Sequence, residues 1–384
     1  MALLFAAPLP ALSQDVRPRV RDLGVEPGIL PAGHRNAITD VAGVKVGHRT
    51  LLEGNSIRTG VTAIIPAPGN LFERKVTAAV YVANAFGKAA GFLQVQELGT
   101  IETPIVLTNT LSVGTAVDAV VAWTLRQAGN EDVRSVNAVV GETNDGYLND
   151  IRAQRVAASD VIAAIEAASD GPVEEGSVGA GTGTRALGWK GGIGTASRVL
   201  PQSMGGYTVG ALVQSNFGGI LTIDGVKVGE LLGNHMYRDE LRRAGKSPHE
   251  PPGSSHDQGS VMIVLATDAP LAPRNLQRLA RRAVLGLART GSFMSNGSGD
   301  FVIAFSSANR YPHAAEPAVR SVEDLHNDRM SPLFLAAVES VEEAIYNSIL
   351  RATTVKGFED RTVEAIPIER LRSLFEERSR SRNE

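Results

Sequence analysis

The chain has 384 residues, a formal net charge of −3, and 43% hydrophobic and 21% charged residues. These fractions are typical of a soluble globular protein with a sizeable core, and the absence of a basic excess argues against a nucleic-acid partner. The chain contains no cysteine, which excludes thiol nucleophiles, disulfides and cysteine-ligated metal sites and is compatible with an oxidising compartment.

Residues 1–13 read "MALLFAAPLPALS" and resemble the apolar part of a secretory signal, with small residues at Ala11 and Ser13. A positively charged start is missing, and the apolar run is too short to cross a bilayer. Two interpretations stay open. A truncated signal peptide predicts a periplasmic protein, whereas a frayed N-terminal arm predicts a cytosolic enzyme. No other segment is long enough for a transmembrane helix.

Short apolar runs alternate with helical patterns in the first two thirds of the chain. Runs rich in Val and Ile predict strands, at 61–66, 78–84, 103–109 and 136–142. Apolar residues at helical spacing predict a helix over 113–129, on Val117, Val120, Val121 and Leu125. A second helix is predicted over 150–171. The glycine-rich stretch 178–200 predicts a hairpin with tight turns, followed by alternating strands over 207–219 and 220–229.

The last third repeats this order. A strand over 261–267 precedes a helix that begins near Pro273 and carries one apolar face, of Leu276, Leu279, Ala283 and Leu287. A strand over 301–307 precedes a helix with Ser331 as N-cap and Pro332 in its first turn. Clustered strands with helices in separate runs predict layered α/β sheets covered by helices. The single candidate for an internal boundary is the Pro/Gly-rich loop 246–259.

Several familiar active-site motifs are absent. The glycines of 179–194 do not fit GxGxxG, and neither GxxxxGK[ST], HExxH nor GxSxG occurs. The seven histidines are scattered singly, so no metal site is predicted. A Ser-His-Asp triad assembled in space from His249 or His256 stays an alternative.

Four polar segments lie at the ends of predicted strands, where a sheet can present side chains into a cleft. They are "GETNDGYLND" (141–150), "QSNFGG" (214–219), the Gly259-Ser260 junction and "SNGSGDF" (295–301). Each also has an ordinary interpretation, because Asn, Gly, Ser and Asp form turns. In that interpretation Asn216 caps a turn, Tyr147 packs in the core, and Glu142 and Asp145 are solvated loop carboxylates.

Longer blocks carry a resemblance that covers nearly the whole chain after residue 20. They are "ITDVAGVKVGH" (38–48), "VANAFGKAAGFLQVQELGTIETPIVLTNTLSVGTAVDA" (82–119), "GTGTRALGWKGGIGTASR" (181–198), "QSNFGG", "GSVMIVLATDAPL" and "GSGDFVIAFSSA". With these blocks the chain resembles the self-processing serine aminopeptidases that include L-aminopeptidase/D-esterase-amidases and β-peptidyl aminopeptidases. The resemblance implies a four-layer αββα sandwich, like that of N-terminal nucleophile hydrolases but with its own strand connectivity.

The resemblance also implies that one catalytic domain, 14–384, cuts itself between Gly259 and Ser260. The products would be an α chain of residues 14–259 and a β chain of residues 260–384, which stay associated and form a homotetramer of αβ pairs. Gly259 lacks a Cβ, so the serine oxygen can approach the preceding carbonyl and a strained peptide is tolerated. The freed amine of Ser260, with an ordinary pKa of about 7.7–8.0, can act as a base or proton relay beside the hydroxyl nucleophile.

The remaining roles carry over from the family to matching positions. Ser298 and Asp300 would relay and balance the proton, although some members have Glu in place of Asp300. Asn216 would donate its amide to the oxyanion. Tyr147 would assist the oxyanion or the leaving group, and Glu142 would anchor the ammonium of the substrate.

The implied reaction removes N-terminal residues, either β-amino or small L- or D-amino acids, from peptides, amides and esters through an acyl-enzyme on Ser260. The partner is a small substrate with a free amine; no metal, organic cofactor, nucleic acid or membrane is implied. Three alternatives remain: an acyltransferase of the ornithine-acetyltransferase type on a related fold, another amide hydrolase or acylase, and a binding protein with a decayed site. Phe86 and Trp189 either line the substrate pocket or pack in the core.

Overall fold

Two β-sheets form the centre of the computed structural model, which describes residues 17–244, 258–314 and 317–383. The larger sheet has six strands in the order β4-β3-β12-β11-β10-β9, and the smaller has four in the order β1-β2-β5-β6. The strands of the larger sheet are β3 (Arg74–Ala85), β4 (Thr100–Ile101), β9 (Gly192–Val199), β10 (Thr208–Asn216), β11 (Gln258–Thr267) and β12 (Gly297–Pro312). Those of the smaller sheet are β1 (Lys45–Glu53), β2 (Ile57–Ile65), β5 (Ile105–Asn109) and β6 (Val139–Thr143).

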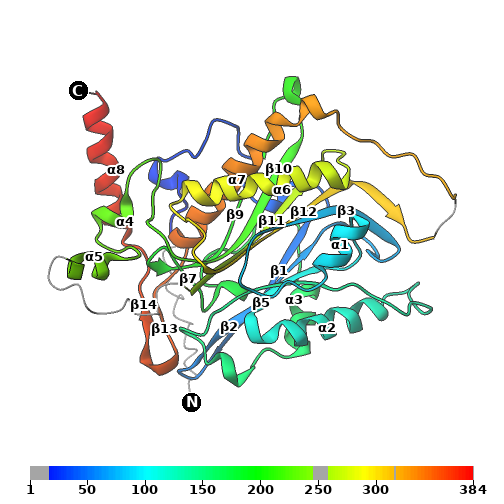
Figure 1. The fold of residues 1–384 in the computed structure, drawn as a ribbon, viewed down its shortest axis with the longest axis horizontal. Coiled ribbons are helices and arrows are strands. Elements are labelled where there is room, and N and C mark those ends of the chain that lie inside the picture. Colours follow the sequence, from blue (N-terminus) through cyan, green and yellow to red (C-terminus); the bar gives the residue numbers. More distant parts are fainter. Residues whose placement is uncertain (1–16, 245–257, 315–316, 384) are drawn as a thin grey trace, which may run out of the picture.

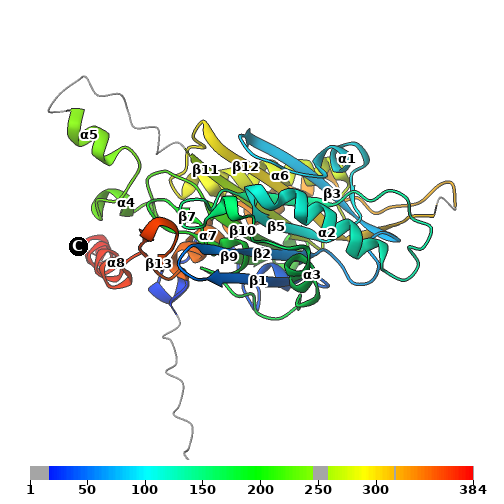
Figure 2. The ribbon, with the colours of Figure 1, turned by 90° about the horizontal axis from the view of Figure 1, so that it is seen from below.

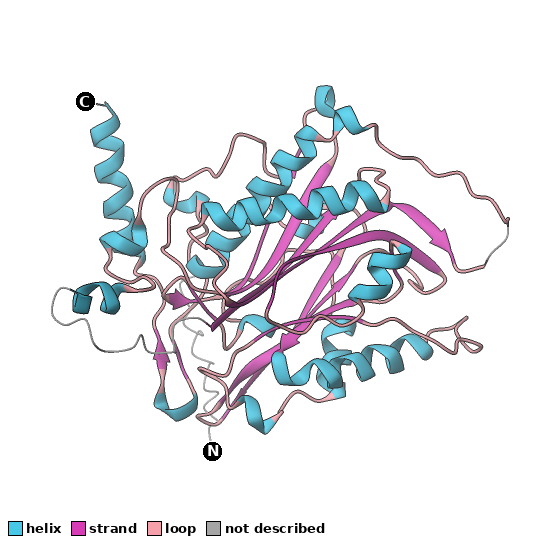
Figure 3. Cartoon of the chain, viewed as in Figure 1, coloured by secondary structure: helices cyan, strands magenta, loops and turns pink. Residues whose placement is uncertain are grey.

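Helices cover the outer face of each sheet, so the molecule has four layers in the order αββα (Figure 1). The larger sheet is covered by α6 (Pro273–Arg289) and α7 (Ser331–Leu350), and the smaller by α2 (Val113–Leu125) and α3 (Ala158–Glu166). Figure 3 shows the same layers as helices above and below the strands. The predicted four-layer sandwich is confirmed.

Strand β11 shows why the sheets stack in this way. Val261, Ile263 and Leu265 point toward the layer of α6 and α7, whereas Met262 and Val264 point toward the smaller sheet. Each of these side chains is at most 1% exposed. Because side chains alternate between the two faces of a strand, a strand covered on both faces reads as a continuous apolar run. This accounts for the apolar sequence after Ser260.

The predicted strands and most predicted helices are present, but two segments differ. The helix predicted over 150–171 shrinks to α3, because Ile151–Ala153 form a single 3-10 turn and Gln154 takes a left-handed φ of 47°. The prediction of a strand over 220–229 is wrong. There the chain makes a turn closed by the bridge between Ile223 and Val226, then enters the short helix α4 (Val228–Leu231).

Two helix details also differ from the prediction. Helix α7 begins at Ser331, and its N-cap is Met330 without a side-chain cap, so the prediction of Ser331 as N-cap is wrong. In α2 the fully buried stripe consists of Ala116, Ala119 and Val120, while Leu125 is 42% exposed. Small residues let α2 pack closely on β5 and β6, and the larger apolar residues lie beside them. The apolar face predicted for α6 is buried throughout.

Several short elements gather at one end of the sandwich, as Figure 2 shows in the region of α4, α5 and α8. They include the hairpins β7 (Arg185–Ala186) with β8 (Trp189–Lys190) and β13 (Val355–Lys356) with β14 (Thr362–Val363). The helices there include α5 (Arg238–Ala244) and α8 (Ile368–Asn383), while α1 (Phe92–Leu98) lies beside β3. In the described part of the chain, no helix combines the length and apolar character needed to span a bilayer.

The proposed internal boundary, loop 246–259, lies mostly outside the described residues. The strands on its two sides, β10 and β11, pair directly as antiparallel neighbours in the larger sheet. The predicted strand 261–267 starts earlier than expected, at Gln258, because Gln258 and Gly259 already pair with Gly297 and Ser298 of β12.

Candidate active site

Ser260 is the third residue of β11 and lies in the middle of the larger sheet. It pairs with Asn216 on the antiparallel strand β10 and with Gly299 on the parallel strand β12. Its residue surface is 3% exposed. Paired residues on neighbouring strands share a face of a sheet, so the Ser260 and Asn216 side chains both point toward the smaller sheet.

Two nitrogen donors converge on the Ser260 hydroxyl. Its Oγ accepts the backbone N–H of Asn144 at 3.4 Å and the side-chain amide of Asn216 at 3.5 Å. Both distances are long, as is common before a substrate tightens a catalytic site. The Asn216 amide is held at both ends, since Nδ2 donates to Asn144 O at 2.9 Å and Oδ1 accepts Arg185 N–H at 3.0 Å. A fixed amide and a backbone N–H beside a nucleophile can stabilise a developing oxyanion.

Ser298 and Asp300 form a hydrogen-bonded pair on β12. Ser298 Oγ donates to Asp300 Oδ1 at 2.7 Å, and each residue is 1% exposed. Burial raises the pKa of Asp300 to about 6, against the opposing effect of the Ser298 hydrogen bond. Asp300 Oδ2 is buried and has no hydrogen-bond partner among the described residues.

The strand register places this pair behind Ser260 rather than beside its hydroxyl. Ser298 pairs with Gly259 and Asp300 pairs with Val261. The Ser298 hydroxyl and the Asp300 carboxyl therefore lie on the face of the sheet opposite the Ser260 side chain. A Cβ on Gly259 would lie 3.3 Å from Ser298 Oγ. The pair therefore adjoins the peptide bond that precedes Ser260. Gly259 is in an extended strand and its φ is not positive, so the strained peptide expected at this glycine is not seen. What the glycine provides is space beside Ser298 Oγ.

Glu142, at the end of β6, is buried rather than solvated. It is 2% exposed, its Oε1 accepts Lys88 N–H at 2.9 Å, and the Thr110 hydroxyl donates to Oε2. Burial raises the pKa of Glu142, while these two hydrogen bonds oppose the rise. A Cβ on Gly87 would lie 2.8 Å from Phe301 Cε2 and 3.1 Å from Glu142 Oε1, so a larger residue there would crowd both side chains.

Asp145 is buried as well, which makes the interpretation of both loop carboxylates as solvated groups wrong. Its Oδ1 accepts the Asn149 side-chain amide at 3.0 Å, and burial raises its pKa to about 7. Lys190, also fully buried, donates to Gly181 O at 2.9 Å and Gly191 O at 2.8 Å, and burial lowers its pKa to about 7. The bond between Asp145 and Asn149 braces the loop that carries Asn144.

Tyr147 lies at one end of the site and is 37% exposed, so the core-packing interpretation is wrong. Two guanidinium groups lie near its ring, with Arg185 Cζ at 4.2 Å and Arg361 Cζ at 5.2 Å from the ring centroid. Among the described residues no hydrogen bond joins Tyr147 to Ser260, and its predicted role at the oxyanion stays a prediction.

A cavity of about 870 Å³ opens beside Tyr147 at the end of the sandwich. Its walls come from the β7–β8 hairpin, the residues after β10, the α4–α5 region and β14; the lining residues include Tyr147, Arg185, Trp189, Phe217, His235, Arg238 and Arg361. Trp189, 8% exposed, lines this cavity, whereas Phe86 is 65% exposed and does not.

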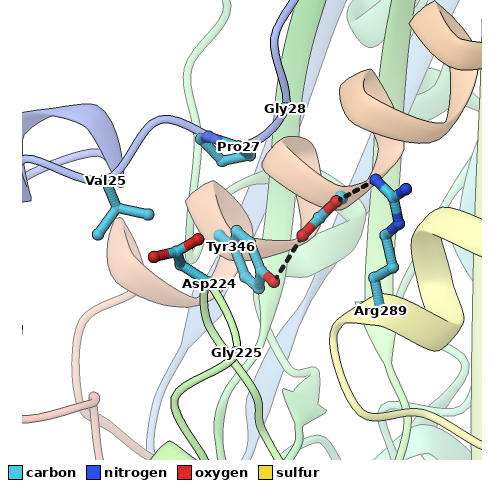
Figure 4. Close-up of a pocket in the computed structure, with 8 residues that line it drawn as sticks. Val25, Pro27, Gly28, Asp224, Gly225, Arg289 and Tyr346 are labelled. Carbon is cyan, nitrogen blue, oxygen red and sulfur yellow. Dashed lines mark hydrogen bonds and ion pairs between the residues drawn. The ribbon is translucent and has the colours of Figure 1, made fainter. Parts of the chain in front are cut away.

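A second cavity, of about 220 Å³, has no serine, threonine or cysteine among its lining residues (Figure 4). Figure 4 shows Tyr346 and Arg289 directed at one carboxylate. Tyr346 donates to Glu342 Oε1 at 3.0 Å and Arg289 to Oε2 at 3.1 Å. Arg289 lies on α6 and both Glu342 and Tyr346 lie on α7, so these bonds link the two helices. None of the residues that contact Ser260 lines this cavity.

Sequence reasoning missed the groups that act through the backbone. The N–H groups of Asn144, Lys88 and Arg185 position or contact the site residues, and any residue type can provide such a donor. Asn144 lies inside the polar segment 141–150, which was the only available indication. His249 and His256 lie outside the described residues. The described ranges contain no group of three or more His, Asp or Glu residues arranged to hold a metal ion.

Two facing sheets between helical layers, with a buried Gly-Ser junction on a central strand, are the features expected of the N-terminal-nucleophile hydrolase class of architecture. Residues 36–363 match the model of Peptidase family S58. The chain is 42% identical over 372 residues to a β-peptidyl aminopeptidase of Sphingosinicella microcystinivorans, covering 93% of this chain and 92% of that protein.

Solved structures agree with this match. A β-aminopeptidase from Burkholderia sp. is 43% identical with a TM-score of 0.83, covering 94% of this chain and 98% of the other. The L-aminopeptidase D-Ala-esterase/amidase of Ochrobactrum anthropi, described as a variant of the Ntn hydrolase fold, is 39% identical with a TM-score of 0.84, covering 95% and 99%. The chain belongs to peptidase family S58 and is an aminopeptidase.

Proposed function

We propose that the chain is the precursor of a serine aminopeptidase that cuts its own Gly259–Ser260 bond and then uses Ser260 as an N-terminal nucleophile. One observation carries this proposal: the bond lies in β11 between two sets of polar groups on opposite faces of the sheet. Asn216 and Asn144 contact the Ser260 hydroxyl on one face, and the Ser298–Asp300 pair adjoins Gly259 on the other.

Self-cleavage would begin with attack of Ser260 Oγ on the Gly259 carbonyl carbon. The C–N bond breaks as the new C–O bond forms, and the hydroxyl proton moves to the departing nitrogen. Water then hydrolyses the ester, which leaves a Gly259 carboxylate and a free Ser260 with both amine and hydroxyl. The products are the chain that ends at Gly259 and the chain 260–384; if residues 1–13 are removed as a signal peptide, the first of these is 14–259.

In turnover, the freed amine would take the proton of the attacking hydroxyl and later return it to the leaving nitrogen. The Ser298–Asp300 pair lies on the backbone side of Ser260, which is where the new amine would be, and the buried Asp300 carboxylate would balance its positive charge. Asn216 and Asn144 would hold the oxyanion of the acyl intermediate.

The substrate would be a small peptide, amide or ester with a free N-terminal amine. Glu142 keeps lone pairs free beyond its two hydrogen bonds and would accept the substrate ammonium. Identity to a β-peptidyl aminopeptidase favours N-terminal β-amino acids, with small L- or D-residues as the other candidates. A panel of β-homoalanyl, L-alanyl and D-alanyl p-nitroanilides separates these classes. Two further properties stay predictions. Size-exclusion chromatography would test the assembly of αβ pairs into a tetramer, and cell fractionation would test a periplasmic location.

The decisive experiment compares Ser260→Ala with the native chain. The native protein should give two bands on a denaturing gel, with Ser260 as a new N-terminus, and should hydrolyse the panel. Ser260→Ala should stay a single inactive chain. Ser373→Ala, an exposed change on α8, is the matched control and should behave as native. Normal turnover by Ser260→Ala contradicts the proposal, as does acetyl transfer from acetylornithine without peptide hydrolysis.

A further inference from the structure

The large cavity beside Tyr147 contains one arginine whose charge is not neutralised. Arg185 lines the cavity, and within the described ranges no carboxylate pairs with its guanidinium. The other arginines of the wall do have acidic partners: Arg238 pairs with Asp239 at 2.9 Å, and Arg361 pairs with Glu359.

Neither acidic residue of the wall pairs with Arg185. Glu364 accepts the hydroxyl of Thr354 at 2.9 Å, and Asp239 is paired with Arg238. Arg185 itself is half-buried against Tyr147, and burial lowers its pKa, with the nearby Arg361 charge acting in the same direction. Arginine nevertheless stays protonated in proteins, so a partly desolvated cation faces this cavity without a counter-ion. An anion entering the cavity would be favoured there.

The sheet order says which part of a substrate would reach Arg185. Ser260 lies on β11, with β12 and β3 on one side and β10 and β9 on the other. Glu142 lies on the first side, because it binds the backbone of Lys88, just after β3. Arg185 lies on the second side, since its N–H binds Asn216 at the end of β10. A substrate whose ammonium is at Glu142 and whose carbonyl is at Ser260 therefore directs its leaving group toward Arg185.

We propose that this cavity is a leaving-group subsite in which Arg185 binds a carboxylate, so that the preferred substrates are di- and tripeptides with a free C-terminal carboxylate. This inference rests on the proposed function of Ser260. A guanidinium can bind a carboxylate through two parallel N–H···O bonds, which gives both strength and orientation. Trp189 and Phe217 provide an apolar wall for the side chain of the leaving residue.

The size and position of the cavity fit such a leaving group. Its volume of about 870 Å³ is within the range of small-molecule sites and exceeds the needs of a single small residue. Arg185 N–H lies 3.0 Å from Asn216 Oδ1, and the same side-chain amide contacts Ser260 Oγ at 3.5 Å. A single side chain, that of Asn216, therefore links the Arg185 backbone to the Ser260 hydroxyl, which places the start of the Arg185 side chain close to the nucleophile.

The test measures kcat/KM for matched pairs of substrates that differ only at the C-terminus. A dipeptide and a tripeptide are prepared as free acids and as C-terminal amides, with the N-terminal residue that the p-nitroanilide panel shows to be cleaved fastest. The measured quantity is the ratio of kcat/KM for the acid to that for the amide. The native enzyme should favour the acid about tenfold or more, because hydrogen bonds to charged groups contribute about 1.5–3 kcal/mol. Arg185→Gln should bring the ratio close to one, a fall of about tenfold or more.

Arg134→Gln, an exposed arginine in a loop, is the matched control and should leave the ratio unchanged. A native ratio near one overturns the inference without any variant, so it stays decidable even if Arg185→Gln fails to fold. An Arg185→Gln ratio within threefold of native also overturns it, since an arginine that merely positions Asn216 would affect acid and amide alike. Failure of the native protein to cleave any substrate contradicts the proposed function instead.

Discussion

Replacing Asp300 with Asn should stabilise the uncut precursor at alkaline pH, although it removes a candidate catalytic group. Asp300 is 1% exposed, and its Oδ2 has no hydrogen-bond partner in the described structure. An ionised carboxylate in this position loses its hydration without full compensation. An Asn side chain keeps an oxygen that can accept the Ser298 hydroxyl and carries no charge.

The magnitude follows from the pKa of Asp300, which burial raises from 3.8 to about 6 in the folded protein. When the pKa of an acid is higher in the folded than in the unfolded protein, its protonated form contributes to the free energy of unfolding. This contribution is fully present below the unfolded pKa and is lost as the pH rises through the folded pKa. One pKa unit corresponds to about 1.4 kcal/mol, so at pH 8 ionised Asp300 destabilises the fold by about 3 kcal/mol relative to a neutral isostere. At pH 4.5 the difference falls to about 1 kcal/mol.

The assay uses the Ser260→Ala background, so that both proteins stay uncut. Thermal unfolding of Ser260→Ala is compared with that of Ser260→Ala/Asp300→Asn at pH 8 and pH 4.5. With an unfolding entropy of about 2.1 cal/mol/K per residue, 3 kcal/mol corresponds to a rise in Tm of about 4 °C at pH 8. The rise should shrink to about 1 °C at pH 4.5. Asp132→Asn, at a fully exposed aspartate, is the control and should change Tm little at either pH.

Two results would refute this reasoning. A lower Tm for Asp300→Asn at pH 8 would mean that the carboxylate makes interactions worth more than its desolvation. An equal rise at both pH values would mean that the gain does not come from removing an ionised group.

Three further predictions concern the site. Asn216→Ala should lower kcat about 10²–10³-fold, the usual effect of removing one oxyanion donor, and a change of less than threefold in purified, cut enzyme would exclude that role. Glu142→Gln should raise KM for free-amine substrates about tenfold or more through loss of a charge-assisted bond, and an unchanged KM would move the ammonium site elsewhere. Gly259→Ala should slow the appearance of the two bands in a gel time course, because the new Cβ would lie 3.1 Å from Phe217 Cα and 3.3 Å from Ser298 Oγ. Cleavage at the native rate would show that space at Gly259 is not limiting.

The sequence alone was sufficient for the layered architecture. Apolar runs with flanking turn residues located the long strands, and the spacing of Leu276, Leu279 and Ala283 located α6, because these patterns depend only on local backbone geometry. Local patterns failed where tertiary contacts chose the conformation. Residues 220–229 alternate like a strand but fold into a turn and helix α4, since they find no strand partner in the described structure.

For the site, the sequence determined which residues are present, including the Gly259-Ser260 junction, Asn216 and the Ser298-Asp300 pair. Only the tertiary structure decided on which side of the nucleophile each one lies. The pairing of β11 with β12 sets Ser298 and Asp300 behind Ser260, and a register shifted by one residue would have put them beside its hydroxyl. Strand register depends on contacts between segments far apart in the chain, which no local pattern encodes. The same holds for the positions of Glu142 and Arg185 on opposite flanks of Ser260.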